Sequence, residues 1–392
     1  MRKIDSLDFF YLAMPEIQDI ADGSQDALLV RVTAGDQVGW GECEASPLVT
    51  IAGLVCPMSH SVCKPVSASV LGEKLEHPAD IVRIHQKVRR NSLDLLQADH
   101  VLSGIDVALW DLLGKVYELP VYRLLGFKEA YPKLPYYSVL FGESPQDTLE
   151  KARLARRNGF RAVKFGWGPF GRDSLEADDD QVMAAREGLG PEGMLCIDAG
   201  AVWDEDVAAA RQRMRTLQAC HVIWLEEPFH THALHAYHKL AQISGRVKLA
   251  GGEGLHNEQQ AIQMINYAGI GYVQIDTGRI GGITAAKRVF DYAKARRVRY
   301  VNHTFTSHLA LSASLQVYAG AADFDLCEYP GQLSPLAHDL TQSHLELDAQ
   351  GLVHLPEEVG LGITPDLEVA RKYLVDSEIR VNGKLLYQTP RL

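Results

Sequence analysis

The sequence predicts an α/β protein in which a closed parallel (β/α) barrel follows a smaller α+β domain. From Leu134 onward, short apolar runs alternate with helical segments, and six of these runs end at an acidic residue or a histidine. The six residues are Asp198, Glu226, Glu253, Asp276, His303 and Glu328. They are separated by 28, 27, 23, 27 and 25 residues, a step that fits one strand, one helix and two short loops.

Counting the segment PYYSVL as the first barrel strand gives eight strands, the last of which ends near Tyr329. The later helices begin near Asp204, His232, Asn257, Thr284 and His308. This alternation favours a closed parallel barrel. An open dinucleotide-binding sheet would need GxGxxG after its first strand, and the sequence has none. Because the strand ends of a barrel converge on one face, the six residues are expected to share one site.

The first part of the chain does not show the barrel period. Segments 27–33 and 37–42 predict a hairpin that turns between them. Helical spacing of apolar residues predicts two helices, near 79–97 and 101–117.

We therefore expect an α+β domain over residues 1–128 and the barrel over residues 129–335. The tail, residues 336–392, is expected to pack back on the first domain. A chain of 392 residues with 46% hydrophobic and 23% charged residues can form this much core.

The net charge of −11 argues against nucleic-acid or anionic-membrane surfaces, which require a basic face. No run reaches the roughly 18 apolar residues of a membrane span, and Asp5 and Asp8 interrupt any signal-like N-terminus. The six cysteines do not form a disulfide framework in a chain this long. We expect a cytoplasmic homo-oligomer whose partner is a small molecule.

Asp198, Glu226 and Glu253 end three successive predicted strands. Three carboxylates in one cleft raise each other's pKa unless a cation is bound. Oxygen ligands without a nearby cysteine favour Mg²⁺. The alternative is that each carboxylate caps the helix that follows it. Glu227 competes with Glu226 for the ligand role, because the two point to opposite faces of the strand.

Asp276 and His303 end the next two strands, so they are expected to be neighbours. A carboxylate beside an imidazole orients the ring and raises its basicity, which suits a proton acceptor. The alternative is a histidine bonded to the backbone. Lys164 ends the second strand, where it would contact a substrate carboxylate or form an ion pair.

Two further clusters could imitate metal sites. In the first, CPMSHSVC, the spacing is wrong for a zinc knuckle and a fourth ligand is missing. The second comprises His230, His232, His235 and His238, and its helical spacing fits a solvated face better.

Several motifs together resemble the enolase superfamily, in its mandelate racemase subgroup. They are SGIDVALWDLLGK (103–115), IDAG (197–200), WLEEP (224–228), GGEG (251–254), QIDTGRIGG (274–282) and VNHTF (301–305). The resemblance covers almost the whole chain and implies a (β/α)7β TIM-type barrel with an α+β capping domain. It also implies that Glu226 is the ligand, that Asp276 and His303 form an acid–base dyad, and that Glu328 hydrogen-bonds the substrate carboxylate.

The sequence departs from this family's pattern in two places. The family often carries Lys-x-Lys at the end of the second strand, where the second lysine is a base on the face opposite the histidine. Here Gly166 replaces that base. Gly200 stands where the family often has Asn. The chain also lacks the lysine of the muconate-lactonising branch, since Gly278 occupies that position.

The expected chemistry is Mg²⁺-dependent abstraction of the proton next to a carboxylate, followed by β-elimination of water. An acid-sugar dehydratase of this kind, a lyase, turns a sugar acid into a 2-keto-3-deoxy acid. One base suffices for this reaction, whereas a racemase or epimerase would need a second base recruited from elsewhere, such as Tyr137. A catalytically silent barrel that acts as a binding or structural protein is the alternative of another class.

Loops of the capping domain are expected to contact the far end of the substrate. The candidates are residues 13–25 and 44–64. The first loop has no Lys or Arg, which disfavours a diacid substrate, while His60, Lys64 and Arg172 keep that option open.

Overall fold

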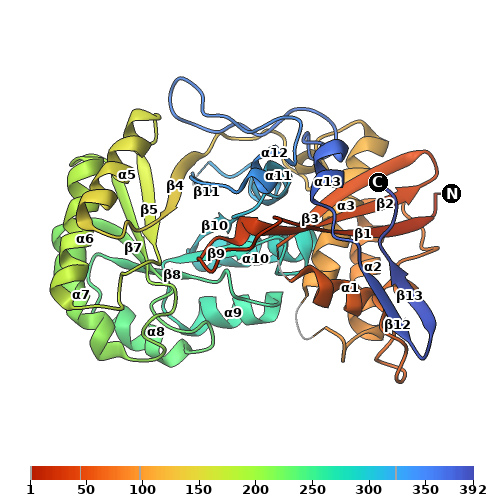
Figure 1. Cartoon of the computed structure of the whole chain (residues 1–392), viewed down its shortest axis with the longest axis horizontal. Helices are drawn as coiled ribbons and strands as arrows, with labels where there is room; N and C mark the ends of the chain where they lie inside the picture. The colour runs from red at the N-terminus through yellow and green to blue at the C-terminus, as the bar shows by residue number, and fades with distance from the viewer. Residues whose placement is uncertain (1, 45, 97–98, 323–324) are drawn as a thin grey trace.

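The structure is a computed structural model that describes residues 2–44, 46–96, 99–322 and 325–392. Two parts lie side by side along the long axis of the molecule (Figure 1). The barrel, coloured yellow to light blue, occupies the left and centre of that view, and the N-terminal sheet lies to its right.

The N-terminal part is a three-stranded antiparallel sheet covered by helices. Its strands are β1 (Ser6–Ala13), β2 (Asp26–Ala34) and β3 (Gln37–Cys43), in the order β1-β2-β3. Its helices are α1 (Pro47–Val55), α2 (Pro78–Asn91), α3 (His100–Tyr117) and α4 (Val121–Leu124), with short 3-10 turns η1 (Gly23–Gln25) and η2 (Val66–Ser69). The predicted hairpin is therefore β2–β3. The first predicted helix ends six residues early, at Asn91.

Helix α3 crosses strand β3 at a distance that only glycine permits. A Cβ atom on Gly39 would lie 2.1 Å from the carbonyl oxygen of Ala108, and one on Gly41 would lie 2.3 Å from that of Gly104. Side chains at either position would push the helix off the sheet. The two glycines therefore let β3 pack directly against α3. This contact sets the position of the residues that follow β3.

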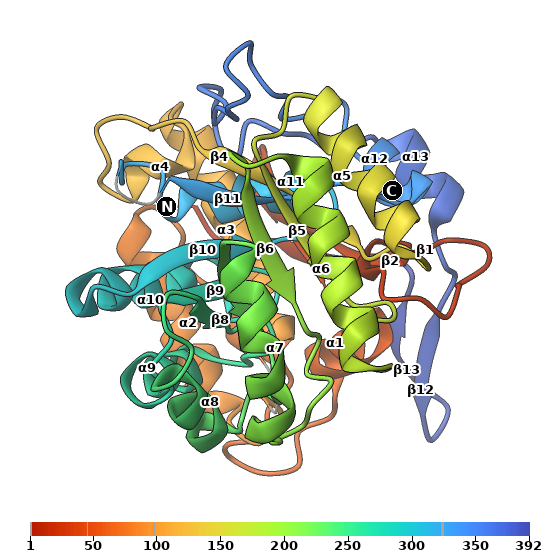
Figure 2. The same cartoon turned by 90° about the vertical axis from the view of Figure 1, so that its left-hand side faces the viewer.

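The barrel contains eight parallel strands in the order β10-β9-β8-β7-β6-β5-β4-β11. They are β4 (Leu134–Leu140), β5 (Ala162–Gly166), β6 (Met194–Asp198), β7 (Val222–Glu226), β8 (Lys248–Gly251), β9 (Tyr272–Asp276), β10 (Arg299–His303) and β11 (Leu326–Pro330). The helices between them are α5 (Pro145–Arg157), α6 (Leu175–Leu189), α7 (Val207–Ala219), α8 (Leu234–Ala241), α9 (Glu258–Tyr267), α10 (Gly282–Arg296) and α11 (His308–Gln316). Figure 2 shows α5 to α7 on the outside of β5 and β6. The predicted fold class is confirmed.

A side chain bridges the two strands at the ends of this order. Asn302 on β10 donates from Nδ2 to the carbonyl oxygen of Glu328 on β11 (3.3 Å). Its Oδ1 accepts from the Glu328 backbone N–H (3.0 Å) and from the Tyr318 hydroxyl (2.8 Å). This amide imitates a ladder pair between β10 and β11 and sets the two strand ends side by side. Inside the barrel, one layer of buried side chains includes Tyr136, Trp224 and Val301.

The C-terminal segment contains α12 (Pro335–Asp339), α13 (Leu367–Tyr373) and the hairpin β12 (Glu378–Val381)–β13 (Lys384–Gln388). The Tyr387 hydroxyl donates to the Phe9 carbonyl (2.7 Å), and the Val375 N–H donates to the Tyr11 carbonyl (2.8 Å). Both bonds join the segment to β1. The domain boundaries near residues 128 and 335 stay predictions.

None of the helices in the described ranges combines the length and the apolar character that crossing a membrane requires.

Candidate active site

A cavity of about 320 Å³ opens over the carboxyl ends of the barrel strands. The seven residues singled out from the sequence all lie within two residues of these ends: Lys164 in β5, Asp198 in β6, Glu226 in β7, Glu253 after β8, Asp276 in β9, His303 in β10 and Glu328 in β11. Five of them, all except Glu226 and Asp276, line the cavity. Residues far apart in sequence thus meet at one place, as the strand-end argument requires.

Asp198, Glu226 and Glu253 each offer an oxygen within 4.8 Å of the others. Burial raises the pKa of Asp198 to about 7 and that of Glu226 to about 8; neighbouring carboxylates add to this effect, while the Lys164 ammonium opposes it. Buried carboxylates that disfavour their own ionisation are what a cation would relieve. Three convergent hard oxygens fit Mg²⁺, which leaves the remaining positions to water or substrate.

Lys164 lies among carboxylates. Its Nζ is 2.6 Å from Glu226 Oε1, 2.9 Å from Glu328 Oε1 and 3.4 Å from Asp198 Oδ2. Burial alone would lower its pKa, but these charges outweigh it and hold the pKa well above the usual value. The ammonium therefore keeps its proton. Lys164 forms the ion pairs that were one expectation for it, and it also lines the cavity that a substrate would enter.

The neighbouring glutamates of WLEEP point in different directions. Glu226 is fully buried and accepts a hydrogen bond from Trp224 Nε1 at Oε2 (3.0 Å). Glu227 has a left-handed backbone (φ 36°), and its Oε1 accepts from the Gly252 N–H (3.4 Å). Only Glu226 belongs to the convergent group of three.

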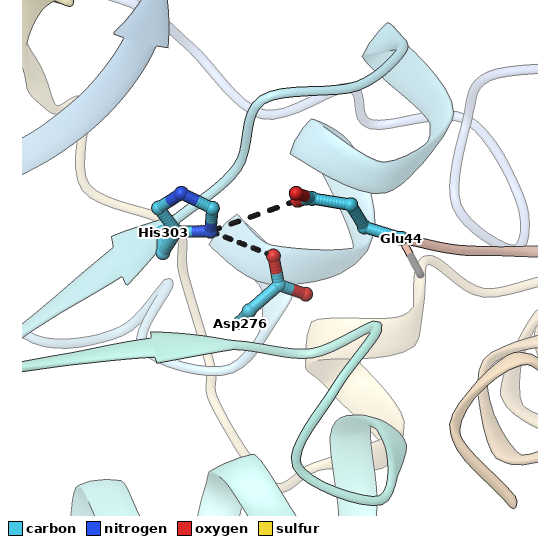
Figure 3. A group of neighbouring side chains, drawn as sticks. All are labelled: Glu44, Asp276 and His303. Atoms are coloured by element: carbon cyan, nitrogen blue, oxygen red, sulfur yellow. Dashed lines mark hydrogen bonds and ion pairs between the residues drawn. The ribbon is translucent and has the colours of Figure 1, made fainter. Parts of the chain in front are cut away.

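His303 and Asp276 form a hydrogen-bonded pair at the ends of the neighbouring strands β10 and β9 (Figure 3). The distance from His303 Nδ1 to Asp276 Oδ2 is 2.8 Å, and Asp276 Oδ1 accepts from the Gly278 N–H (2.5 Å). A carboxylate at Nδ1 keeps the proton on that nitrogen and leaves Nε2 as the exchanging atom. Nε2 lies 3.3 Å from Glu253 Oε2 and 3.8 Å from Glu328 Oε2.

The charges around His303 favour its protonated form. Burial would lower its pKa, but the carboxylates of Glu253, Glu328, Asp276 and Glu44 together hold the pKa well above the usual value. Burial would likewise raise the pKa of Asp276, yet its hydrogen bond to His303, together with the charges of His303 and Arg279, outweighs burial and keeps the pKa below the usual value.

Two charged residues of this side were not singled out from the sequence. Glu44 follows the end of β3 and reaches the cavity, where its Oε2 lies 3.7 Å from His303 Nδ1 (Figure 3). Arg279, three residues beyond Asp276, forms an ion pair with Glu44 Oε1 and lies 3.7 Å from Glu253 Oε1. Glu44 was hidden because it ends an antiparallel strand, to which the barrel argument does not apply.

Among the described residues at the end of β5, there is no second base of the kind the family often carries. Gly166 ends β5, and a Cβ there would lie 2.8 Å from Asp198 Cβ and 2.9 Å from its Oδ2. A Cβ on Gly200 would lie 2.8 Å from Trp167 Cδ2. Trp167 itself has a left-handed backbone (φ 56°), which costs a non-glycine residue about 1–3 kcal/mol. The two glycines make room for the Asp198 carboxylate and the Trp167 indole.

Tyr137, considered as a recruited base, does not line the cavity. Its ring packs edge-on against Phe160, with the ring centres 4.9 Å apart. Its strand neighbours Tyr136 and Ser138 face the barrel interior and the cavity instead. Tyr137 lies outside the cavity lining because alternate residues of a strand face opposite sides.

The other two clusters do not form metal sites among the residues that the structure describes. Among the described residues, the groups whose side chains could hold an ion are Asp198–Glu226–Glu253 and Glu44–Asp276–His303. His60 pairs with Asp94 at 2.7 Å, and the His230 and His232 rings stack on each other. Within the second group, His303 is already bonded to Asp276, and Glu44 is already paired with the positive charge of Arg279.

Comparison with known proteins agrees with this geometry. Residues 147–369 match the family described as enolase C-terminal domain-like. Residues 18–126 match the N-terminal domain of mandelate racemase and muconate lactonizing enzyme. The chain belongs to the enolase superfamily, in its mandelate racemase subgroup.

Individual relatives include enzymes of acid sugars. The L-talarate/galactarate dehydratase of Salmonella typhimurium is 29% identical and covers 79% of this chain and 74% of its own. The 3,6-anhydro-alpha-L-galactonate cycloisomerase of Streptomyces coelicolor is 30% identical over 69% of this chain and 71% of its own. A crystal structure of a "predicted mandelate racemase" from Rhodobacter sphaeroides is 57% identical, covers both chains completely and has a TM-score of 0.96. The family and these relatives support an enzyme.

Proposed function

We propose that this enzyme is an Mg²⁺-dependent acid-sugar dehydratase. It would remove the proton next to the carboxylate of a sugar acid and then eliminate water to form a 2-keto-3-deoxy acid. The observation that carries the proposal is the difference between two sides of the cavity. His303, bonded to Asp276, lies at the end of β10, whereas Gly166, which has no side chain, lies at the end of β5.

The proposed roles follow from position and charge. Asp198, Glu226 and Glu253 would hold the Mg²⁺ ion, which supplies Lewis-acid stabilisation of the negative charge that develops on the substrate carboxylate. Lys164 and Glu328 would contact that carboxylate, since both line the cavity beside the three ligands. Lys164 would add a fixed positive charge there.

His303 Nε2 would take the α-proton once a cation at the three proposed ligands, Glu253 among them, offsets the carboxylate charge that favours the protonated ring. Asp276 would hold the ring through Nδ1. The C3–O bond then breaks as the C2=C3 bond forms, and the imidazolium returns its proton to the departing hydroxyl, which leaves as water. The enol then loses its C2 hydroxyl proton and gains one from solvent at C3, which gives the ketone. One residue on one side serves both proton transfers.

The alternative of a racemase or epimerase requires a second base on the β5 side. The titratable groups on the described strand ends of that side are Lys164 and Asp198, and both are held in ion pairs. An ammonium bound by three carboxylates is a poor proton acceptor. Since Tyr137 points away, this alternative finds less support.

Incubating the Mg²⁺-loaded enzyme with a library of sugar acids and assaying for 2-keto acids tests the proposal. A parallel incubation in D₂O, followed by proton NMR of both α-epimers, separates the two reactions. The dehydratase should consume one α-configuration and leave the other unlabelled. Deuterium that enters with inversion, without any keto acid, would favour the epimerase instead.

A further inference from the structure

The Trp167 side chain lines the cavity but has no role in the proposed proton transfers. The indole is half-buried, lines the cavity and lies over Gly200, where a Cβ would come within 3.0 Å of three of its ring atoms. Its left-handed backbone is fixed between the end of β5 and Gly168, which also has a positive φ (63°). Further along the loop, Phe170 stacks on Phe141 with the ring centres 5.1 Å apart.

Part of the cavity lining is apolar. A substrate whose carboxylate is held beside Lys164 must place its remaining carbons against the cavity lining that carries no catalytic group. The residues of that lining with apolar side chains include Ile20, Leu140, Trp167 and Phe305. A ring face or a C–H surface fits such a wall better than a charged group does.

The charges on the wall point the same way. Asp22, from the 13–25 loop, lines the cavity with its Oδ1 bound by the Ser24 N–H and hydroxyl. Among the described residues that line the cavity, the Lys and Arg side chains are Lys164 and Arg279, and both are paired with carboxylates. His60, Lys64 and Arg172, which had kept a diacid possible, do not line it.

We propose that Trp167 is a specificity-determining residue that selects monocarboxylic sugar acids with an apolar far end over diacids. The inference rests on the proposed dehydratase function and names the substrate class of that same site. The indole would pack against the C–H face of the last carbons, while Asp22 would repel a second carboxylate.

Three compounds that differ only at C6 test this proposal. They are a 6-deoxyaldonate with a methyl group, the aldonate with a hydroxymethyl group and the aldarate with a carboxylate. The set used has the sugar configuration that the library screen shows to be turned over. We expect kcat/KM to fall from methyl to hydroxymethyl to carboxylate, with the aldarate about 100-fold below the methyl compound.

The Trp167→Ala variant should lower kcat/KM for the methyl compound about tenfold and leave the aldarate nearly unchanged, because only the first packs on the indole. Trp167→Phe should recover most of the loss. Tyr267→Ala, which removes an exposed ring at the end of α9, is the matched control and should change neither value. An aldarate that is the best substrate, or an equal loss on all three compounds, would overturn the proposal.

The proposal can fail separately from the dehydratase function. If no sugar acid yields a keto acid, the dehydratase function fails. Calorimetry can then measure how tightly the Mg²⁺-loaded protein binds the three compounds, each in the gluco, galacto and manno configurations. The relative affinities show which group at C6 the cavity lining prefers. Tighter binding of an aldarate than of its 6-deoxy partner would contradict the role of Trp167.

Discussion

The two sides of the cavity differ in what their residues can do with a proton. The β9–β10 side carries His303, whose ring is bonded to Asp276 and approached by Glu44. On the β5–β6 side, Lys164 is held among three carboxylates and Gly166 has no side chain. The number of titratable residues on each side therefore does not by itself indicate which reaction the site performs. In the proposed mechanism, the side on which the proton acceptor stands decides whether one face of a substrate reacts or both.

Removing the proton acceptor should have the largest effect. His303→Asn keeps a polar side chain of similar size but cannot accept a proton, so kcat should fall at least about 10³-fold. Exchange of the substrate α-hydrogen with D₂O should be lost in parallel, which NMR measures directly. An unchanged melting temperature would show that the barrel is intact. If the variant exchanges the hydrogen at the wild-type rate, the acceptor is another residue and the comparison between the two sides fails.

Removing a metal ligand should come next. Glu253→Gln keeps the shape of the side chain but loses a negative oxygen from the group of three, so Mg²⁺ affinity should fall roughly 100-fold, and turnover should fall with it. Calorimetric titration of the apoprotein with Mg²⁺ measures the first effect. Restoration of activity by millimolar Mg²⁺ is the expected control. Full wild-type activity in excess chelator would contradict the metal-dependent mechanism.

The contrast between Asp276 and Glu44 gives a smaller effect. Asp276 Oδ2 is 2.8 Å from His303 Nδ1, whereas Glu44 Oε2 is 3.7 Å away, beyond hydrogen-bond distance. Glu44→Gln should therefore lower kcat only about tenfold, through lost charge attraction and the loss of the Arg279 ion pair. Asp276→Asn, measured beside it, should cost far more because the ring loses its orienting bond. Equal losses would mean that Glu44 is as important to the dyad as Asp276.

Much of the site could be predicted because it repeats. Asp198, Glu226 and the other strand-end residues follow apolar runs at a regular step, and parallel strands bring such ends together. Glu44 could not be found in this way. It is 235 residues from Arg279, and it reaches the cavity only because β3 is fixed against α3 through Gly39 and Gly41.

Local features decided the remaining differences between prediction and structure. The helical pattern of residues 79–97 continues into Leu93, Leu95 and Leu96, but α2 ends at Asn91. The Ser92 hydroxyl donates to the Lys64 carbonyl there (2.7 Å), and Leu93 is 62% exposed. A tertiary bond thus overrides local periodicity. The left-handed backbone of Trp167 is equally invisible in the sequence, because only the Gly200 beside it allows the indole to lie there.

The smallest expected effect is that of a substitution at Gly166, on the β5–β6 side of the cavity. If Gly166 is there to make room for the Asp198 carboxylate, Gly166→Ala should weaken Mg²⁺ binding, since the new Cβ would lie 2.9 Å from Asp198 Oδ2. Asp198 Cβ would be nearer still, at 2.8 Å, so the whole side chain would have to shift, and we expect a loss of about fivefold in affinity. Calorimetric Mg²⁺ titration measures it. Gly53→Ala in α1 is the matched control, because its Cβ would meet Val101 at an ordinary 3.7 Å. Unchanged affinity in Gly166→Ala would mean that a larger residue fits on this side, and that the absence of a second base there has no steric cause.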